Sequence, residues 1–148
     1  MLWTRTRPAK LDYELVFNLM PGMCLVLDRE LTIVAQNFEH AMVSLSLAKD
    51  VVGKNLFEAF PDNPNHAAAG GKSVVHASLL KVLKTRDADV MPVIRHDVQG
   101  ERGPYQVRWW AITNTPILGE DGAVRWIIHR AEDVTELYEL RRAAGKVG

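Results

Sequence analysis

The sequence predicts a mixed α+β domain, with one five-stranded antiparallel sheet, short helices on one of its faces and a further helix at each end. Two observations predict this fold. Two short apolar runs near the start and three longer ones in the C-terminal half have the composition of strands, and turn-forming segments join neighbouring runs. Between these two sets, the apolar residues follow helical spacing. The last strand is free to lie beside the first, which would close a single sheet.

The N-terminal elements are a helix and a hairpin. Asp12 is positioned to cap a helix over residues 13–19, which ends at Met20-Pro21-Gly22 because proline cannot continue a helix. The apolar run over residues 23–27 predicts a buried strand. Residues 31–35, after a short charged turn, predict its hairpin partner.

The middle of the chain is helical and rich in breakers. Asn37 is a candidate cap for a helix over residues 38–48, in which Phe38, Met42 and Leu45 fall near one face. Residues 56–60 predict a single helical turn that Pro61 ends. A breaker-rich loop follows, and Ser73 opens a longer amphipathic helix that ends near residues 85–87. The apolar stripe of this helix is Val75, Leu79, Val82 and Leu83.

The C-terminal half changes to the composition of strands. Residues 90–98, 105–117 and 123–131 predict three antiparallel strands. The segments between them, 99–104 and 119–122, have the glycine-rich chemistry of hairpin turns. Residues 134–144 return to helical composition.

Composition indicates one ordinary globular domain. The chain has 148 residues, with 18 basic and 18 acidic side chains and a formal net charge of zero. Zero net charge argues against a surface that holds nucleic acid or an anionic membrane. The single cysteine, Cys24, excludes an internal disulfide and a Cys-rich zinc site. No apolar run approaches a membrane span of about 20 residues. The first residues lack an apolar signal core, so we expect a cytoplasmic protein.

Three local patterns, in their order and spacing, resemble a Per-Arnt-Sim (PAS) sensory domain. Gly53-Lys54-Asn55-Leu56-Phe57-Glu58-Ala59-Phe60-Pro61 is similar to the turn after the third helix of that family. The stretch from Asn114 to Gly122, "NTPILGEDG", is similar to its hairpin pattern. Glu132-Asp133-Val134-Thr135 matches the ending of its last strand. The resemblance covers roughly residues 12–140.

The resemblance implies a sensor domain over residues 12–133, with a leader helix at 12–20, a flexible leader at 1–11 and an output or linker helix at 134–148. It implies an input module that binds a small ligand or a partner in a cavity between helices and sheet. The change would pass through the last strand, with Asp133 and Thr135 as relay residues, to the C-terminal helix. The implied partner is a downstream effector, such as a histidine kinase or a transcription regulator. The alternative is a ligand-free dimerisation or protein-interaction adaptor.

Catalysis by this chain is not expected, because the sequence has no GxSxG, no phosphate-binding loop and no paired-carboxylate signature. The cofactor stays unknown. Haem and a non-covalent flavin are open, but His76, the candidate haem ligand on the long helix, has no obvious partner. In light-sensing relatives the flavin-reactive cysteine lies in mid-domain, whereas Cys24 lies on the first strand, which argues against a cysteinyl-flavin. The five histidines are scattered without metal-site spacing, so no metal is expected.

The pocket depends on the register of one strand. Trp109 and Trp110 point to opposite faces, and the sequence does not decide which faces inward. If the even-numbered residues do, Trp110 and Asn114 line a pocket with Arg108 near its edge, where a ligand carboxylate or phosphate would pair with the guanidinium. If the odd-numbered residues do, they form a plain core. The predicted pocket residues are Phe57, Leu79, Leu83, Met91, Arg108, Trp110, Ile112 and Asn114.

The outward indole needs cover, because a large exposed aromatic side chain on a sheet usually marks an interface. The leader helix, from this chain or a partner, is the candidate cover. In PAS-like domains that helix often packs on the outer face of the sheet and pairs with its symmetry mate. We therefore expect a homodimer, with packing inside one chain as the alternative. The predicted dimer face is Leu15, Val16, Leu19, Trp109 and Trp126.

Overall fold

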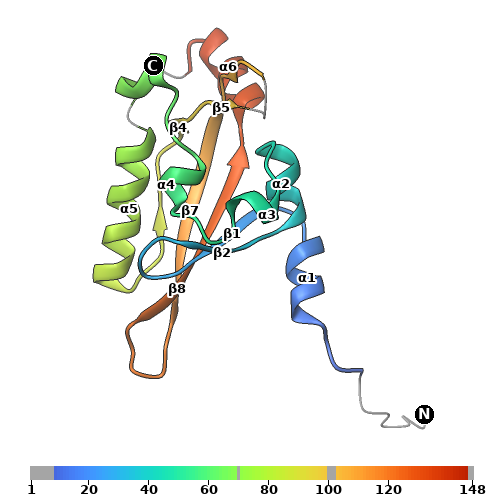
Figure 1. Cartoon of the computed structure of the whole chain (residues 1–148). Coiled ribbons are helices and arrows are strands. Elements are labelled where there is room, and N and C mark those ends of the chain that lie inside the picture. The colour runs from blue at the N-terminus through green and yellow to red at the C-terminus, as the bar shows by residue number, and fades with distance from the viewer. Residues whose placement is uncertain (1–8, 70, 100–102, 147–148) are drawn as a thin grey trace, which may run out of the picture.

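A computed structural model describes residues 9–69, 71–99 and 103–146. In chain order the elements are α1 (Tyr13–Leu19), β1 (Met23–Leu27), β2 (Ile33–Gln36), α2 (Phe38–Val43), α3 (Ala48–Val51), α4 (Leu56–Ala59), a 3₁₀ segment η1 (Pro64–Ala69), α5 (Gly71–Thr85), β3 (Asp89–Val90), β4 (Ile94–Arg95), β5 (Val98–Gln99), β6 (Tyr105–Gln106), β7 (Trp109–Leu118), β8 (Val124–Asp133) and α6 (Thr135–Ala143). Figure 1 shows α4 in front of the sheet, α5 to its left, α6 above it and α1 set apart to its right.

The strands form one antiparallel sheet in the order β2-β1-β8-β7-β3, and β4 also pairs with β7. This confirms the predicted α+β class. It also confirms that the last strand lies beside the first: β1 pairs with β8 from Met23 opposite Ala131 to Leu27 opposite Ile127. The two hairpins of the chain are thereby joined into one surface.

The prediction of one continuous strand over residues 90–98 is wrong. The segment divides into β3, β4 and β5, and the first two share the edge position beside β7. Pro92 lies between them and has no N–H to donate to a ladder, which interrupts the pairing. β5 leaves the main sheet and pairs with β6 in a separate two-stranded sheet. The predicted strand over 105–117 is accordingly divided as well, into β6 and β7.

The N-terminal elements follow the prediction closely. Asp12 caps α1 by accepting a hydrogen bond from the Leu15 N–H at 3.0 Å. β1 has the predicted bounds, whereas β2 begins at Ile33 and not at residue 31. The reason is a tight turn, in which the Asp28 carboxylate accepts the Thr32 N–H at 2.9 Å and Leu31 has a φ of 65°.

The helix predicted over residues 38–48 is wrong in extent and in orientation. Leu45 adopts a φ of 57°, in the left-handed region, and separates α2 from α3. Phe38, Met42 and Leu45, the predicted apolar face, are exposed, whereas His40 is buried. The cap is as predicted, since the Asn37 carboxamide oxygen accepts the His40 N–H at 3.1 Å.

The C-terminal elements keep their type and move their boundaries. α5 begins at Gly71, two residues before the predicted start at Ser73, and buries Val75, Leu79 and Val82 as predicted. β8 extends to Asp133, and α6 begins at Thr135 instead of residue 134. Of the predicted flexible leader, residues 1–8 lie outside the described residues, as do residues 100–102 of the predicted turn before β6.

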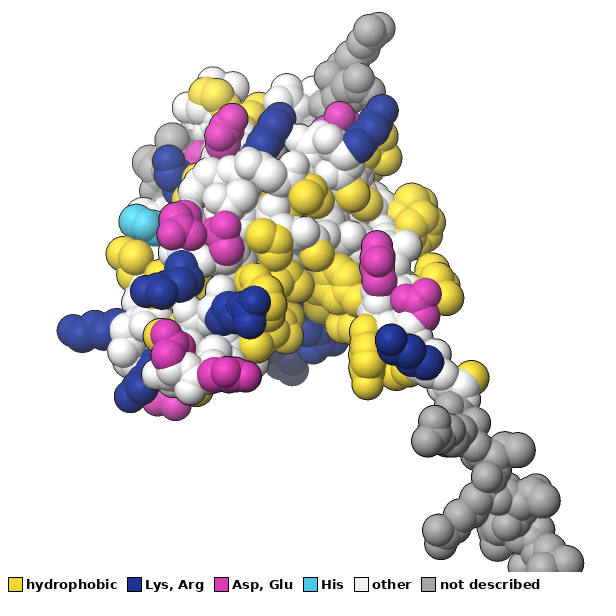
Figure 2. Space-filling view, turned by 60° about the horizontal axis from the view of Figure 1, so that its bottom comes forward, with side chains coloured by type: hydrophobic (Ala, Val, Ile, Leu, Met, Phe, Trp, Pro, Cys, Tyr) yellow, Lys and Arg dark blue, Asp and Glu magenta, His cyan; other side chains and the backbone are white. Residues whose placement is uncertain are grey.

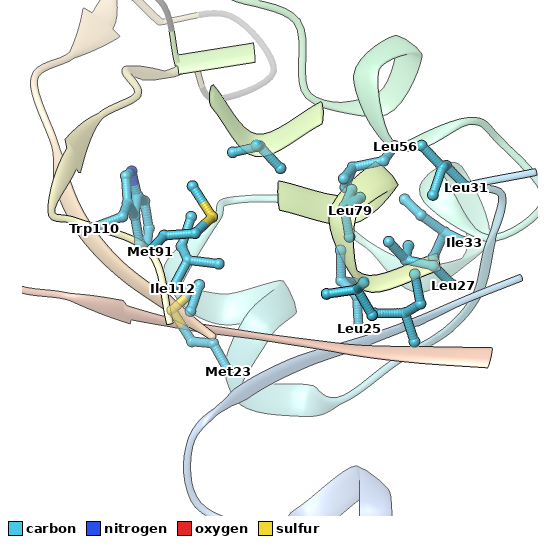
Figure 3. Packing of buried hydrophobic residues seen from close by; sticks show 14 of the residues in the cluster. Met23, Leu25, Leu27, Leu31, Ile33, Leu56, Leu79, Met91, Trp110 and Ile112 are labelled. Atoms are coloured by element: carbon cyan, nitrogen blue, oxygen red, sulfur yellow. The ribbon is translucent and has the colours of Figure 1, made fainter. Parts of the chain in front are cut away.

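The core lies between the sheet and the helices on its inner face. Figure 3 shows its labelled side chains in two groups. One surrounds Leu27 and Ile33, where α4 and α5 contribute Leu56 and Leu79; the other contains Trp110, Met91, Ile112 and Met23. In the described part of the chain, no helix has the length and apolar composition to cross a membrane.

Candidate functional site

A cavity of about 70 Å³ lies between the inner face of the sheet and helices α2, α4 and α5. Apolar and aromatic side chains dominate its wall, and three histidines interrupt them. The described residues that line it are Met23, Leu25, His40, Ser44, Leu56, Phe57, Phe60, Gly71, Lys72, Val75, Ile94, His96, Val98, Trp110, Ile112, His129 and Ala131.

The strand register is the one in which even-numbered residues of β7 face inward. Trp110, Ile112 and Asn114 are buried, and Trp109 is turned to the other face. The Trp110 indole N–H is satisfied, because it donates to the His96 carbonyl at 2.7 Å. Trp110 therefore presents an apolar ring to the cavity.

Three of the eight predicted pocket residues line the cavity, namely Phe57, Trp110 and Ile112. The other five do not. Leu79, Met91 and Asn114 are buried elsewhere in the core, and Leu83 is half-buried near the turn between β7 and β8. The Arg108 guanidinium has partners within the protein: it donates to Gln106 Oε1 at 2.6 Å and forms an ion pair with the Asp133 carboxylate at 3.6 Å.

The sequence analysis missed His40, His96 and His129 as wall residues. His129 lies between Ile127 and Ala131 on the inward-facing register of β8, so the two-residue period of that strand was the available signal. His40 had no such signal, because the apolar residues of its helix predict the opposite face. Its position depends on packing between α2 and the sheet.

A chain of hydrogen bonds decides the state of His129. The Asp89 carboxylate accepts the Ser78 hydroxyl at 2.7 Å and the Lys81 ammonium at 3.0 Å, and these bonds lower the pKa of Asp89. Because a carboxylate only accepts, Ser78 Oγ must accept the Asn114 amide N–H at 2.9 Å. Asn114 Oδ1 then faces His129 Nδ1 at 2.6 Å, so Nδ1 carries the ring proton. Burial lowers the pKa of His129 to about 4, which keeps it neutral.

A second network gives His40 the opposite tautomer. The Ser44 hydroxyl donates to the His40 carbonyl at 2.6 Å, so the Ser46 hydroxyl donates to Ser44 Oγ at 2.7 Å. The Gln36 amide N–H groups then donate to Ser46 Oγ at 2.8 Å and to His40 Nδ1 at 3.0 Å. Nδ1 accepts, and the proton lies on Nε2. Burial lowers the pKa of His40 to about 3.

A polar cluster joins Asp62 and Asn63, in the loop between α4 and α5, to residues 95–97 of the β4–β5 segment. The His96 ring lies 3.2 Å from the Asp62 carboxylate, and burial lowers the pKa of His96 although Asp62 opposes this shift. Asp97 accepts two hydrogen bonds from Arg95 at 2.9 Å and one from Asn63 at 3.0 Å. Of the residues in this cluster, His96 lines the cavity.

The candidate cofactor residues lie away from the cavity wall. His76 is exposed on α5 and meets Phe57 edge-on, with 5.5 Å between ring centroids. Cys24 is buried on β1, does not line the cavity, and has a thiol pKa that burial raises. A volume of about 70 Å³ does not fit haem or flavin, because sites for drug-sized ligands measure about 300–1,000 Å³. The described residues contain no metal-binding cluster of three or more His, Cys, Asp or Glu.

The predicted relay residues join the sheet to α6. Asp133 Oδ1 accepts the Thr135 N–H at 3.0 Å and the Thr135 hydroxyl at 2.5 Å, while Thr135 Oγ1 accepts the Trp109 N–H at 2.9 Å. Val134 is the N-cap of α6, and no side-chain bond caps the helix there. Trp109 stacks on Tyr138 of α6 at 3.9 Å between centroids. The outward indole is thus covered by the C-terminal helix, and not by the leader helix.

The leader helix leaves its apolar residues uncovered. Leu15, Val16 and Leu19 are exposed, and α1 has no buried residue. On the outer face of the sheet, Trp126 is half-buried and lies under the Arg125 guanidinium, 4.2 Å from its ring centroid. Figure 2 shows hydrophobic side chains gathered on the surface between the body of the domain and α1.

Fold and sequence together place the chain in a known family. The family model described as PAS fold matches residues 17–139, most of the chain, so the chain belongs to the PAS family. The search of curated proteins found no match.

Solved structures agree on the fold. The PAS domain of a protein from Colwellia psychrerythraea has 14% identity and a TM-score of 0.66, covering 84% of this chain and 95% of that one. A sensory box sensor histidine kinase from Vibrio cholerae has 18% identity and a TM-score of 0.56, covering 83% and 88%. The PAS domain of nitrogen regulation protein NR(II) from Vibrio parahaemolyticus has 16% identity and a TM-score of 0.57, covering 84% and 99%.

Proposed function

We propose that this PAS domain is a sensory input module of a signalling protein, without catalysis of its own. It would bind a small ligand in the cavity between helices and sheet and pass the change through β8 to α6. The observation that carries the proposal is that one strand, β8, runs from the cavity wall to the start of α6. His129 and Ala131 line the cavity on the strand that leads, two residues after Ala131, to Asp133 and the start of α6.

The junction offers a physical route for the signal. The Val134 N–H donates to the Trp109 carbonyl at 2.9 Å, so the first residues of β7 and the start of α6 share main-chain and side-chain bonds. A shift of β7 or β8 at the cavity would change this joint and the Trp109–Tyr138 stack. Such a change would bias two arrangements of α6.

A substitution inside the cavity tests the relay without a known ligand. Ala131→Val adds two methyl groups to the cavity wall and should change hydrogen exchange of the α6 amides. Ala111→Val is the matched control, because Ala111 is half-buried on β7 in the opposite register and does not line the cavity. If α6 exchange is the same in both variants and the wild type, the relay is wrong.

We also propose that the module works as a homodimer through α1. Leu15 and Leu19 are 54% and 65% exposed, and apolar side chains on one helix turn are costly to leave in water unless a partner covers them. Leu15→Glu with Leu19→Glu should shift the molecular mass in sedimentation equilibrium from dimer to monomer. Leu80→Glu, on the exposed side of α5, is the control that should not.

The exposed apolar side chains also support the second candidate function, a ligand-free adaptor. Phe38 and Met42 on α2 are 56% and 61% exposed, next to Leu19 on the same surface hollow. A dimer whose α6 ignores changes in the cavity would favour this reading. In either case we propose a cytoplasmic protein whose partner is a signalling effector, such as a histidine kinase or a transcription regulator.

A further inference from the structure

Each of the two buried histidines keeps one ring nitrogen free for the cavity. Nδ1 of His40 and of His129 is held by a neighbouring side chain, and neither Nε2 has a hydrogen-bond partner among the described residues. Among the described residues, two polar side-chain atoms are both fully enclosed and without a hydrogen-bond partner, namely Gln36 Oε1 and Arg108 Nε. The two Nε2 atoms have no partner either, but they are not among these enclosed atoms, so each of them borders open space. Both histidines line the cavity, which is therefore the space that their Nε2 atoms face.

The two free nitrogens are complementary. The Gln36–Ser44–Ser46 network leaves a proton on His40 Nε2, which is a donor. The chain from Asp89 to Asn114 leaves a lone pair on His129 Nε2, which is an acceptor. The two residues are only 5% and 6% exposed. A molecule in the cavity that carries one acceptor and one donor would satisfy both nitrogens.

The volume limits the size of that molecule. The cavity measures about 70 Å³, well below the roughly 300–1,000 Å³ of sites for drug-sized ligands, so we expect a small molecule.

The wall excludes a charged molecule. Both rings are neutral near pH 7, and most of the remaining wall is apolar. Among the described wall residues, Lys72 alone has a permanent charge; it is exposed, with its ammonium 5.6 Å from the Phe57 ring centroid. An ion inside the cavity would lose its hydration without a buried partner of opposite charge, which is costly.

We propose that the cavity binds a small neutral molecule with one hydrogen-bond acceptor, held by His40, and one donor, held by His129, such as a short primary alcohol or amide. This inference rests on the proposed ligand-binding function and specifies the class of ligand.

The tautomers are tested first, on the wild-type protein and without ligand. Long-range ¹H–¹⁵N correlation at neutral pH should show a protonated Nε2 in His40 and a protonated Nδ1 in His129. If both rings carry the proton on the same type of nitrogen, the donor–acceptor pair does not exist and the proposed class is wrong.

Binding is then tested with probes that differ in one property. Propionamide and propan-1-ol are neutral and carry both donor and acceptor; propionate and propylammonium have nearly the same shapes and are charged. Methyl resonances of Met23 and Ile112, which line the cavity, report occupancy. We expect saturable shifts with the two neutral probes and none with the two ions. Equal or stronger binding of either ion would overturn the proposal.

A His129 variant and xenon binding distinguish a failure of the proposed ligand class from a failure of ligand binding itself. His129→Phe keeps a ring and removes the acceptor, so propionamide should bind roughly tenfold more weakly. His76→Phe, outside the cavity, should leave binding unchanged. Xenon enters small apolar cavities. Shifts with xenon but not with propionamide or propan-1-ol would overturn the ligand class and leave ligand binding intact. No shift with any probe would overturn both.

Discussion

Acid should destabilise this protein at a pH where most of its carboxylates are still ionised, because His40 and His129 are buried neutral. Their ordinary pKa is 6.5, and burial lowers it to about 3 for His40 and about 4 for His129. Between these values and 6.5, the unfolded chain binds more protons than the folded one, so stability rises with pH. The stability is fully present above about pH 7.5, begins to fall near pH 6.5, and goes on falling until the pH reaches the folded pKa values of about 4 for His129 and about 3 for His40.

The size of the loss follows from the same shifts. One pKa unit corresponds to 1.36 kcal/mol, so at pH 5 each histidine costs about 2 kcal/mol relative to pH 8. Together they cost about 4 kcal/mol, a large part of the 5–15 kcal/mol that about 100–150 residues usually provide. Burial also lowers the pKa of His96, which acts in the same direction. The lowered pKa values of Asp89 and Asp97 matter only below about pH 4.

The assay is urea unfolding followed by tryptophan fluorescence at pH 8, 6.5 and 5 and constant ionic strength. His129→Gln removes one titrating ring, so its free energy of unfolding should lose about half as much between pH 8 and 5, whatever its stability at pH 8. His76→Gln changes an exposed ring and should keep the wild-type pH dependence. A wild-type loss below about 1 kcal/mol, or an unchanged slope in His129→Gln, would refute the buried-neutral histidines.

Three further substitutions test the wall, the network and the junction. Gly71→Ala places a Cβ 2.8 Å from the Arg95 carbonyl oxygen, and a backbone atom cannot easily move away. Urea unfolding should therefore show that the free energy of unfolding falls by about 1–3 kcal/mol; an unchanged midpoint contradicts the close approach. Asn114→Leu leaves His129 Nδ1 without its partner and removes the amide donor to Ser78 Oγ, so it should cost about 2–4 kcal/mol by the same measurement; a neutral effect contradicts the network. Thr135→Val removes the oxygen that accepts the Trp109 N–H, so hydrogen exchange of the Trp109 amide should accelerate about tenfold; equal protection contradicts the junction.

Local chemistry was sufficient for most elements. Asp12 and Asn37 cap the helices predicted for them, because a short polar side chain next to free N–H groups acts within a few residues. The pairing of the first and last strands followed from having one sheet to close. Pro92 was also visible in the sequence, and it interrupts the predicted third strand at the place where a missing N–H matters most.

The site was predicted only in part. Phe57, Trp110 and Ile112, three of the predicted pocket residues, line the cavity; Trp110 and Ile112 do so because the even-numbered residues of β7 face inward, a register that the sequence left open. Arg108 was predicted to pair with a ligand anion. Instead it donates to Gln106, two residues before it, and forms an ion pair with Asp133 at the end of β8. Asn114 was predicted at the wall and instead orients the residue that is there, His129.

What the sequence determined by itself is the class of fold, the order of its elements and the family, because caps, turns and hydrophobic periods are properties of neighbouring residues. Only the tertiary structure decided what the cavity can hold. His40 turns inward against the apolar pattern of its own helix, where Gln36 donates to its Nδ1 and Ser44 donates to its carbonyl oxygen. The tautomer of His129 depends on Asp89, 40 positions away in the chain. Such long-range partners have no local signature in the sequence, and they set the donor and the acceptor of the site.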